Sequence, residues 1–179
     1  MMDLTKNTPS MFDKGVREVK VELRWDGSYD ADVYAFALGN NKKCPTEGHF
    51  CFFKQLNILG GAIKHSGDMR TGDTITGEEP DEFMVFDLSK MPADVQDIVV
   101  CLSIYNAPNS GETFGMMSQF TATLITDNTK VAIIDLANNH GDNYGMEVLK
   151  ISRVNGNWAV TPLGDSEKAD INAFYRRYL

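Results

Sequence analysis

Short runs of alternating apolar and polar residues, separated by turn-forming residues, constrain the fold of this chain more than any other feature. In the clearest run, Val19, Val21 and Leu23 alternate with charged residues, which is the period of a strand with one buried face. Further strands are expected at residues 33–38, 49–53, 63–66, 82–88, 98–105, 120–126, 130–136, 148–154 and 158–162. The run 82–88 is apolar on both faces, so we expect it to be a central strand. Turn signals roughly every 8–12 residues, without helix–strand alternation, predict an all-β sandwich or barrel.

The connections between these runs contain recognisable turn sequences. Asn155-Gly156-Asn157 is the strongest hairpin signal in the chain, and Asp127-Asn128-Thr129 marks a second hairpin. After the last strand, Ser166 is expected to cap a short C-terminal helix. The apolar face of that helix would hold Ile171, Phe174 and Tyr178. The sequence contains no linker, repeat or low-complexity tract, so its 179 residues suit a single domain covering positions 1–179.

A glycine-punctuated stretch from His65 to Glu82 concentrates negative charge. It sets one Arg and one His against six carboxylates: Asp68, Asp73, Glu78, Glu79, Asp81 and Glu82. The glycines indicate a loop, and a long loop in a compact domain is usually functional or disordered. Oxygen-rich loops are an ordinary way to hold Ca²⁺, which takes roughly 6–8 oxygen ligands. The other interpretation is a solvated acidic loop, and we expect His65 to orient it.

A second acidic segment, Trp25 to Asp32, lies upstream. Asp30 and Asp32 stand two residues apart at the start of an apolar run, so in an extended chain their side chains point the same way. Two carboxylates on one side repel each other, and a divalent ion would relieve that repulsion. The acids and glycine do not fit the EF-hand spacing. A calcium site would therefore be assembled from two segments that converge only in the fold.

The order of several short motifs resembles the TerD-type tellurium-resistance and stress-protein domain. The matching pieces are Leu4 to Pro9, Trp25-Asp26, Asp30 to Phe36, His65 to Gly72, Asp81-Glu82 and Asp87 to Val95. Each piece alone would be weak, but together they cover nearly the whole chain in the expected order. The resemblance implies a two-sheet antiparallel β-sandwich in a cytoplasmic bacterial stress-response system. It also implies calcium binding through the two acidic stretches, and other proteins of that system as partners.

The resemblance implies a set of calcium ligands and shows where this chain departs from the family. The candidate ligands are Asp30, Asp32, Asp68, Asp81 and Glu82, with Asp26, Asp73, Glu78 and Glu79 in second rank. Met69 stands where the family usually has Asn, and Pro80 replaces an acid. Residues 74–76 dilute a glycine- and aspartate-rich run, and Asn106 stands where an acid often follows a strand. These departures bear on affinity and on the number of ions more than on the fold.

Charge and cysteine content exclude several other classes of function. The 17 basic and 25 acidic residues give a net charge of −8, which disfavours nucleic acid because phosphate binding needs clustered Lys and Arg. No apolar run approaches the roughly 20 residues of a membrane span, so membrane association would be peripheral, through partners. Cys51 and Cys101 lie in apolar runs and are expected to be small buried hydrophobes in a reducing compartment. A tellurite-reactive thiol is therefore disfavoured.

The motifs for other chemistry are absent, and two alternatives for the acidic site stay open. His49, His65 and His140 lack the spacing of a zinc site, and no nucleophile motif is visible, so we expect no enzyme. One alternative is a metal-dependent hydrolase on the same acids, selective for Mg²⁺ or Mn²⁺. The other is a small-molecule or carbohydrate binder that bridges its ligand through calcium. That binder would need exposed aromatic residues near the loops, for which the candidates are Tyr29, Tyr105 and Phe114.

Overall fold

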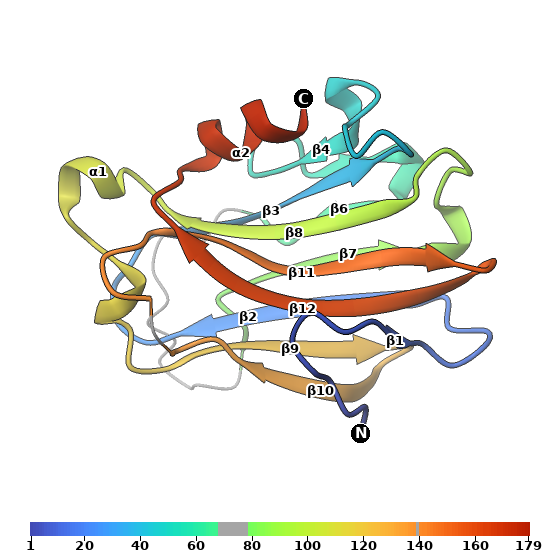
Figure 1. The fold of residues 1–179 in the computed structure, drawn as a ribbon, viewed down its shortest axis with the longest axis horizontal. Helices are drawn as coiled ribbons and strands as arrows, with labels where there is room; N and C mark the ends of the chain where they lie inside the picture. The colour runs from blue at the N-terminus through green and yellow to red at the C-terminus, as the bar shows by residue number, and fades with distance from the viewer. Residues whose placement is uncertain (68–78, 139) are drawn as a thin grey trace.

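The computed structural model describes residues 1–67, 79–138 and 140–179, which form two antiparallel sheets packed face to face (Figure 1). Sheet A has the order β1-β12-β11-β8-β3-β4, with bounds Ser10–Met11, Asn157–Glu167, Gly145–Val154, Asp97–Ile104, Ala31–Leu38 and Phe50–Cys51. Sheet B has the order β10-β9-β2-β7-β6-β5, with bounds Thr129–Asp135, Phe120–Thr126, Glu18–Trp25, Glu82–Asp87, Ile63–His65 and Asn57–Ile58. The predicted β-sandwich is thus confirmed.

Two α-helices and four 3-10 turns accompany the sheets in the described residues. Helix α1 spans Ala107–Ser110 and α2 spans Ile171–Tyr178, and the 3-10 turns are Glu47–His49, Leu59–Gly61, Leu88–Lys90 and Phe114–Met116. The short helix α2 lies over the outer face of sheet A, beside β3 and β4 (Figure 1). The predicted C-terminal helix is therefore present.

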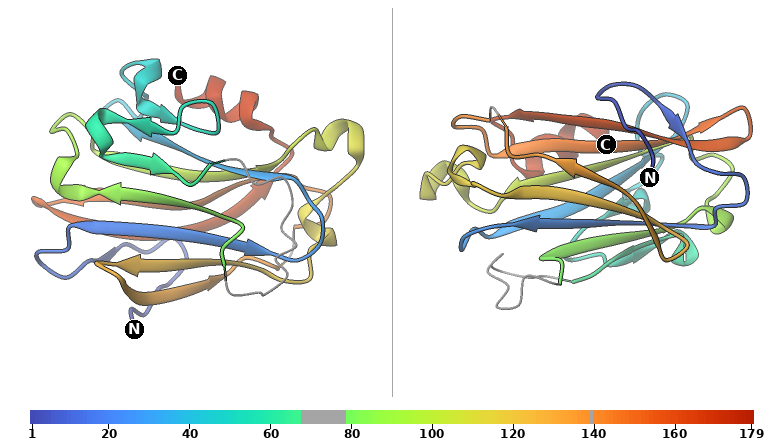
Figure 2. Two further views of the ribbon diagram at one scale, coloured as in Figure 1. Left: turned by 180° about the vertical axis from the view of Figure 1, so that it is seen from behind. Right: turned by 90° about the horizontal axis from the view of Figure 1, so that it is seen from below.

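The two sheets face each other in the view from below (Figure 2, right), and the main core lies between them. In β2 the residues Val19, Val21 and Leu23 are fully buried, as their alternation predicts. In β3 Val33 and Ala35 point into the same core. Full burial of each Val or Leu contributes about 1.5–3 kcal/mol. The strand period thus fixes which face of each sheet meets the other.

Strand β7 lies inside sheet B, between β2 and β6, so its expected central position is confirmed. Glu82, Met84 and Phe86 point inward, whereas Phe83 and Val85 are half-buried. Lys20 of β2 places its ammonium group 4.2 Å from the centroid of the Phe83 ring, so a lysine stem partly covers this aromatic residue. The outer face of sheet B therefore tolerates apolar residues beside charged ones.

The start of helix α2 differs from the prediction. Its cap is Asp170, whose Oδ1 accepts a hydrogen bond from the Ala173 amide (2.9 Å). Ser166 lies inside β12, because β12 continues to Glu167 by pairing with Gly145 of β11. Phe174 is the fully buried residue of the helix and packs on sheet A. The predicted apolar face was correct at that position, and the predicted cap was wrong.

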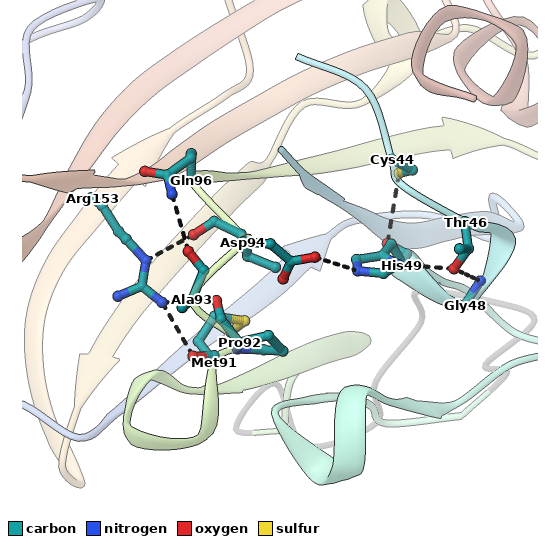
Figure 3. A network of polar contacts seen from close by, with 11 residues as sticks. Cys44, Thr46, Gly48, His49, Met91, Pro92, Ala93, Asp94, Gln96 and Arg153 are labelled. Atoms are coloured by element: carbon teal, nitrogen blue, oxygen red, sulfur yellow. Dashed lines mark hydrogen bonds and ion pairs between the residues drawn. The ribbon is translucent and has the colours of Figure 1, made fainter. Parts of the chain in front are cut away.

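The turns at the far end of the sandwich are fixed by backbone conformation and by one arginine. Asn155 and Gly156 have φ values of 51° and 78°, as a two-residue hairpin turn between β11 and β12 requires. The guanidinium of Arg153 donates to the carbonyl oxygens of Val95 (2.7 Å), Met91 (3.1 Å) and Pro92 (2.9 Å), as Figure 3 shows. It also lies 4.3 Å from the Trp158 ring centroid. Arg153 therefore ties the β7–β8 connection to sheet A.

Candidate metal centre

The first acidic segment is a tight turn between β2 and β3. The indole Nε1 of Trp25 donates to the Tyr29 carbonyl oxygen (3.1 Å), which closes the turn. Gly27 has φ +83°, and a Cβ there would lie 2.7 Å from the Tyr29 ring. Only glycine satisfies both demands without strain. The carbonyl oxygen of Asp30 accepts a hydrogen bond from the Tyr105 amide (2.7 Å), which anchors the end of the turn beside β8.

The second acidic segment reaches the first at Asp81 and Glu82. Asp81 is 1% exposed, and its Oδ2 accepts a hydrogen bond from the Trp25 amide (2.8 Å). Glu82 is fully buried, and its Oε2 accepts one from the Val33 amide (2.5 Å). Segments separated by about fifty residues therefore meet through two buried carboxylates. Their expected convergence in space is confirmed.

The edge of β3 explains why Glu82 lies where it does. Strand β4 pairs with β3 only at Ala35 and Phe36, so the peptide groups of Val33 lie beyond its end. The Val33 amide is taken up by Glu82, and its carbonyl oxygen contacts Nε2 of His65 (2.8 Å). Because a carbonyl oxygen only accepts, Nε2 carries the proton. Two side chains of sheet B thus replace the missing strand at the edge of sheet A.

His65 holds the backbone where the acidic stretch begins, and residues 68–78 of the loop that it was expected to orient lie outside the described residues. Its Nδ1 accepts a hydrogen bond from the Gly67 amide (2.9 Å), at the point where the chain leaves β6. The neighbouring Ser66 is held to β7 by hydrogen bonds in both directions with Phe83 (2.9 and 3.0 Å). With its two ring nitrogens engaged in this way, His65 acts as a structural residue rather than as a metal ligand.

Asp30 and Asp32 differ in their backbone setting. Asp32 belongs to β3, is 7% exposed and lies opposite Ser103. It shares a face with Tyr34, whose pKa is raised well above its usual range, chiefly by burial and in part by the negative charge of Asp32. Because side chains alternate along a strand, Asp32 and Val33 point to opposite faces of sheet A. Asp30 precedes the strand and is half-buried, so the argument that both side chains point the same way, which needs both residues in the strand, does not cover this pair.

Asp26 serves as a clamp on the segment that leads into β9. Its Oδ1 accepts hydrogen bonds from the amides of Ser118 and Gln119 (both 2.9 Å), and its Oδ2 accepts one from the Ser118 hydroxyl. Burial pushes the pKa of Asp26 upward, but these hydrogen bonds outweigh it and leave the pKa below its ordinary value. Both carboxylate oxygens are thus engaged by protein donors, which favours a structural role.

The remaining candidates lie outside the buried part of the centre or outside the described residues. Glu79 is exposed. Asp68, Asp73 and Glu78, together with the departures Met69 and Thr74–Thr76, lie outside the residues that the structure describes. Within residues 1–67, 79–138 and 140–179, no three His, Cys, Asp or Glu side chains form a group that could hold a metal ion.

Two departures from the family have a local explanation. Asn106 has φ +55° and precedes helix α1, a left-handed conformation that Asn tolerates better than most residues. Its Oδ1 accepts a hydrogen bond from Asn109 Nδ2 (2.6 Å), so the side chain is engaged within the α1 turn. Pro80 is half-buried between Glu79 and Asp81. The amide of Asp81 that follows it donates to the Leu23 carbonyl oxygen (2.9 Å).

The other chemistries weighed from the sequence find little support in the described residues. All three cysteines are buried free thiols, and burial raises the pKa of Cys44 and of Cys51 to about 12, so neither is a reactive thiolate. Phe114 is fully buried and cannot be an exposed ligand platform, so that prediction was wrong. Tyr105 is 58% exposed and keeps that possibility open. No helix among the described residues is long and apolar enough to cross a membrane.

Sequence reasoning missed the partners that position Asp81 and Glu82. These partners are the backbone amides of Trp25 and Val33, and a backbone amide leaves no signature in residue type. The only hint in the sequence was the expected strand at 49–53, which is shorter than the strand at 33–38. A shorter neighbour leaves some backbone amides of 33–38 without a partner strand, and side chains can then bind them. The observed neighbour spans two residues, Phe50 and Cys51.

Comparison with known proteins relates this chain to one protein family, both in sequence and in fold. The family model described as the TerD domain matches residues 1–178. The tellurium resistance protein TerD of Alcaligenes sp. is 31% identical over 91% of this chain and 85% of its own length. General stress protein 16U of Bacillus subtilis is 30% identical over the same shares. The crystal structure of a homologue of the telluride resistance protein TerD from Streptomyces coelicolor superposes with a TM-score of 0.75 at 19% identity. That superposition covers 90% of this chain and 96% of the homologue.

Proposed function

The chain belongs to the TerD domain family of tellurium-resistance and stress proteins, and from that premise we propose that its acidic end binds calcium without catalysing a reaction there. One observation above all supports the proposal. Asp81 and Glu82 are almost fully buried and are hydrogen-bonded to the segment that carries Asp30 and Asp32. These hydrogen bonds place the backbones of the two acidic segments side by side, and a divalent cation between the segments would relieve the repulsion among their carboxylates.

The donor chemistry fits calcium better than other common ions. The described candidates are carboxylates, which are hard oxygen donors, whereas zinc prefers sulfur and imidazole ligands. His65 is engaged through both ring nitrogens, and all three cysteines are buried. Two separate loops supply an irregular set of oxygens, which Ca²⁺ accepts, whereas Mg²⁺ demands near-octahedral geometry and retains its water.

The proposed ligands among the described residues are Asp30, Asp32, Asp81 and Glu82. Asp68, with Asp73 and Glu78 in second rank, would complete the set from outside the described residues. When bound, calcium would neutralise charge and fix the two loops at one end of the sandwich. Asp26 and Glu79 are left out, since the first clamps Ser118 and Gln119 and the second is exposed.

The setting of this activity is part of the proposal. We place the protein in the cytoplasm, in agreement with three free cysteines and no disulfide. The loops ordered by calcium would bind other proteins of the same stress-response system, and any contact with a membrane would go through those partners. The general stress protein and the tellurium resistance protein among its relatives support this setting by their names alone.

Calorimetric titration of chelator-treated protein with Ca²⁺ and Mg²⁺ tests the proposal. Changing both Asp30 and Asp32 to Asn should weaken calcium binding severely, because the affinity of hard-cation sites depends on ligand charge. The matched control changes Asp13 and Asp94 to Asn, which removes the same charge from exposed positions in other loops. Unchanged calcium affinity in the Asp30/Asp32 variant, or preferential binding of Mg²⁺ by the parent protein, would contradict the proposal.

A further inference from the structure

A cleft of about 550 Å³ opens between β10 and β12, at the side of the sandwich where the outer strands of the two sheets meet. The N-terminal segment borders it. The Met2 amide donates to the Val131 carbonyl oxygen (2.7 Å), and the Asn7 amide donates to that of Pro162 (2.8 Å). A volume of this size suits a small molecule, since such sites are typically about 300–1,000 Å³. This cleft is separate from the proposed calcium ligands.

One wall of the cleft holds a histidine whose tautomer is fixed by its partners. His140 is 6% exposed, and its Nε2 contacts the Leu136 carbonyl oxygen. Because that oxygen can only accept, Nε2 carries the proton and Nδ1 of the neutral ring is the acceptor. The Ser166 hydroxyl lies 2.9 Å from Nδ1 and therefore donates to it. The centroid of the Phe114 ring lies 5.9 Å from that of the His140 imidazole, and the two ring planes are inclined at 70°, so the phenyl ring packs edge-on against the imidazole.

A third side chain completes the group. Asn143 Nδ2 donates to Ser166 Oγ (3.0 Å). The backbone of Asn143 is held in place, since its amide donates to the His140 carbonyl oxygen (3.0 Å) and its own carbonyl accepts from Phe114 (2.8 Å). One short turn thus presents both the imidazole and the amide to the serine. Ser166 is half-buried and lines the cleft, so a ligand in the cleft reaches its hydroxyl.

We propose that Ser166 is a nucleophile, activated by His140, that takes the acyl group from small uncharged carboxylic esters. Oγ attacks the ester carbon, its proton passes to His140 Nδ1, and the Leu136 carbonyl stabilises the imidazolium through Nε2–H. The Asn143 amide donates to the developing oxyanion. The ester C–O bond then breaks, and the leaving alcohol takes the proton from Nδ1. Water attacks the acyl-serine, gives its proton to Nδ1 and releases the acid, and that proton returns to Oγ. The arrangement follows the general logic of a nucleophile, a base and a group that orients the base.

The lining of the cleft sets the class of ester. Its apolar residues, among them Leu4, Ile134, Leu136 and Leu163, offer a surface for a short acyl chain or an aryl group. Its charged side chains are Lys6, Asp135 and Asp165, a net charge of −1 with His140 neutral. Lys6 is already paired with Asp165 (2.6 Å). An anionic ester would be repelled, so a neutral one is favoured.

A structural role for Ser166, in which the hydroxyl only satisfies a buried histidine, would give the same hydrogen bonds in the resting protein. Covalent labelling separates the two roles, because only an activated hydroxyl displaces fluoride from phosphorus. Chelator-treated full-length protein is incubated with a fluorophosphonate and digested, and the phosphonylated peptides are identified by mass spectrometry. Ser118 is the internal control, since its hydroxyl contacts the Asp26 carboxylate instead of a histidine.

We expect labelling at Ser166 and not at Ser118. The Ser166→Ala variant should lose the label and hydrolyse p-nitrophenyl acetate on the order of 100-fold more slowly than the parent, whereas Ser118→Ala should retain both. A folded protein that is labelled no faster at Ser166 than at Ser118 overturns the proposal. That comparison needs no variant, so it holds even if Ser166→Ala does not fold. Because the chelator removes calcium, the outcome is independent of the proposed metal site.

Discussion

Calcium should slow the opening of the two strand ends that meet at the acidic centre. The amides of Trp25 and Val33 are hydrogen-bonded to Asp81 and Glu82, so an opening that frees either amide also separates the two acidic segments. Any ion held by those segments is then released. A ligand that binds only the closed form stabilises it by RT ln(1 + [L]/Kd), about 2.7 kcal/mol at a hundredfold excess over Kd. The same increment corresponds to roughly 100-fold slower exchange of the two amides.

Amide hydrogen exchange in EGTA and in saturating Ca²⁺ measures this effect directly. The melting midpoint should also rise by roughly 5–10 °C, by the usual scaling for a domain of this length. The Arg153 amide, bonded to the Gln96 carbonyl oxygen at the far end of the sandwich, opens locally without releasing an ion and should change little. The Asp30→Asn/Asp32→Asn variant should lose the effect on Trp25 and Val33. Equal exchange of these two amides in both buffers would refute the reasoning, and the calcium proposal with it.

Three further perturbations have defined outcomes. Without calcium, Glu82→Ala should lower the free energy of unfolding by about 1–3 kcal/mol, because the buried Val33 amide loses its acceptor. Glu82→Gln should retain most of that stability but lose calcium affinity. Urea denaturation measures the stability of each variant, and calorimetry measures its calcium affinity. Arg153→Met removes three hydrogen bonds to carbonyl oxygens and should lower the melting midpoint by roughly 5–15 °C. Arg153→Lys should have an intermediate midpoint. Equal midpoints in the parent and both variants would exclude a stabilising role for Arg153. The pKa of Asp97 is pushed up by burial but lowered more by hydrogen bonds from Lys42 and Ser152, so its folded pKa lies below 3.8. The stability it contributes is therefore complete above about pH 5 and lost as pH falls below about 4, and Asp97→Asn should flatten that part of a urea-denaturation pH series.

Much of the fold could be predicted because its signals are local. The alternation at Val19, Val21 and Leu23 and the Asn155-Gly156 turn each depend on neighbours in sequence, and both were correct. The ends of the strands were less accessible. Strand β12 runs on through Ser166 to Glu167 because β11 pairs with it there, and a polar stretch of this kind reads from sequence as a cap. Pairing partners distant in the chain decide such boundaries.

The candidate site could be predicted in its residue types but not in its construction. Charge density and order of motifs pointed to Asp81 and Glu82, and the structure brings them to the turn that carries Asp30. The sequence did not distinguish a carboxylate that clamps a loop, such as Asp26, from one that faces a partner segment. The difference lies in donors from residues 118 and 119, more than ninety positions away.

The group around Ser166 was invisible for a related reason. His140 and Ser166 lie 26 positions apart with no motif between them, and they meet only because β12 returns beside the turn that follows β10. Phe114 looked like an exposed loop aromatic, yet it packs on that same imidazole. Side chains in loops take their environment from the whole fold, so residue type alone predicts neither burial nor reactivity there.

The short length of β4 has a consequence for genetics. Since Glu82 substitutes for a strand at the edge of sheet A, a loss-of-function allele at this position would report a damaged scaffold as readily as loss of the proposed ion. The same ambiguity attends His65, whose imidazole completes that edge. A screen for alleles that act through metal alone should therefore be directed at Asp30, in the turn, and scored alongside the abundance of the protein in the cell. Under the proposed calcium role, selection for folding and selection for ion binding would act on a single carboxylate at Glu82.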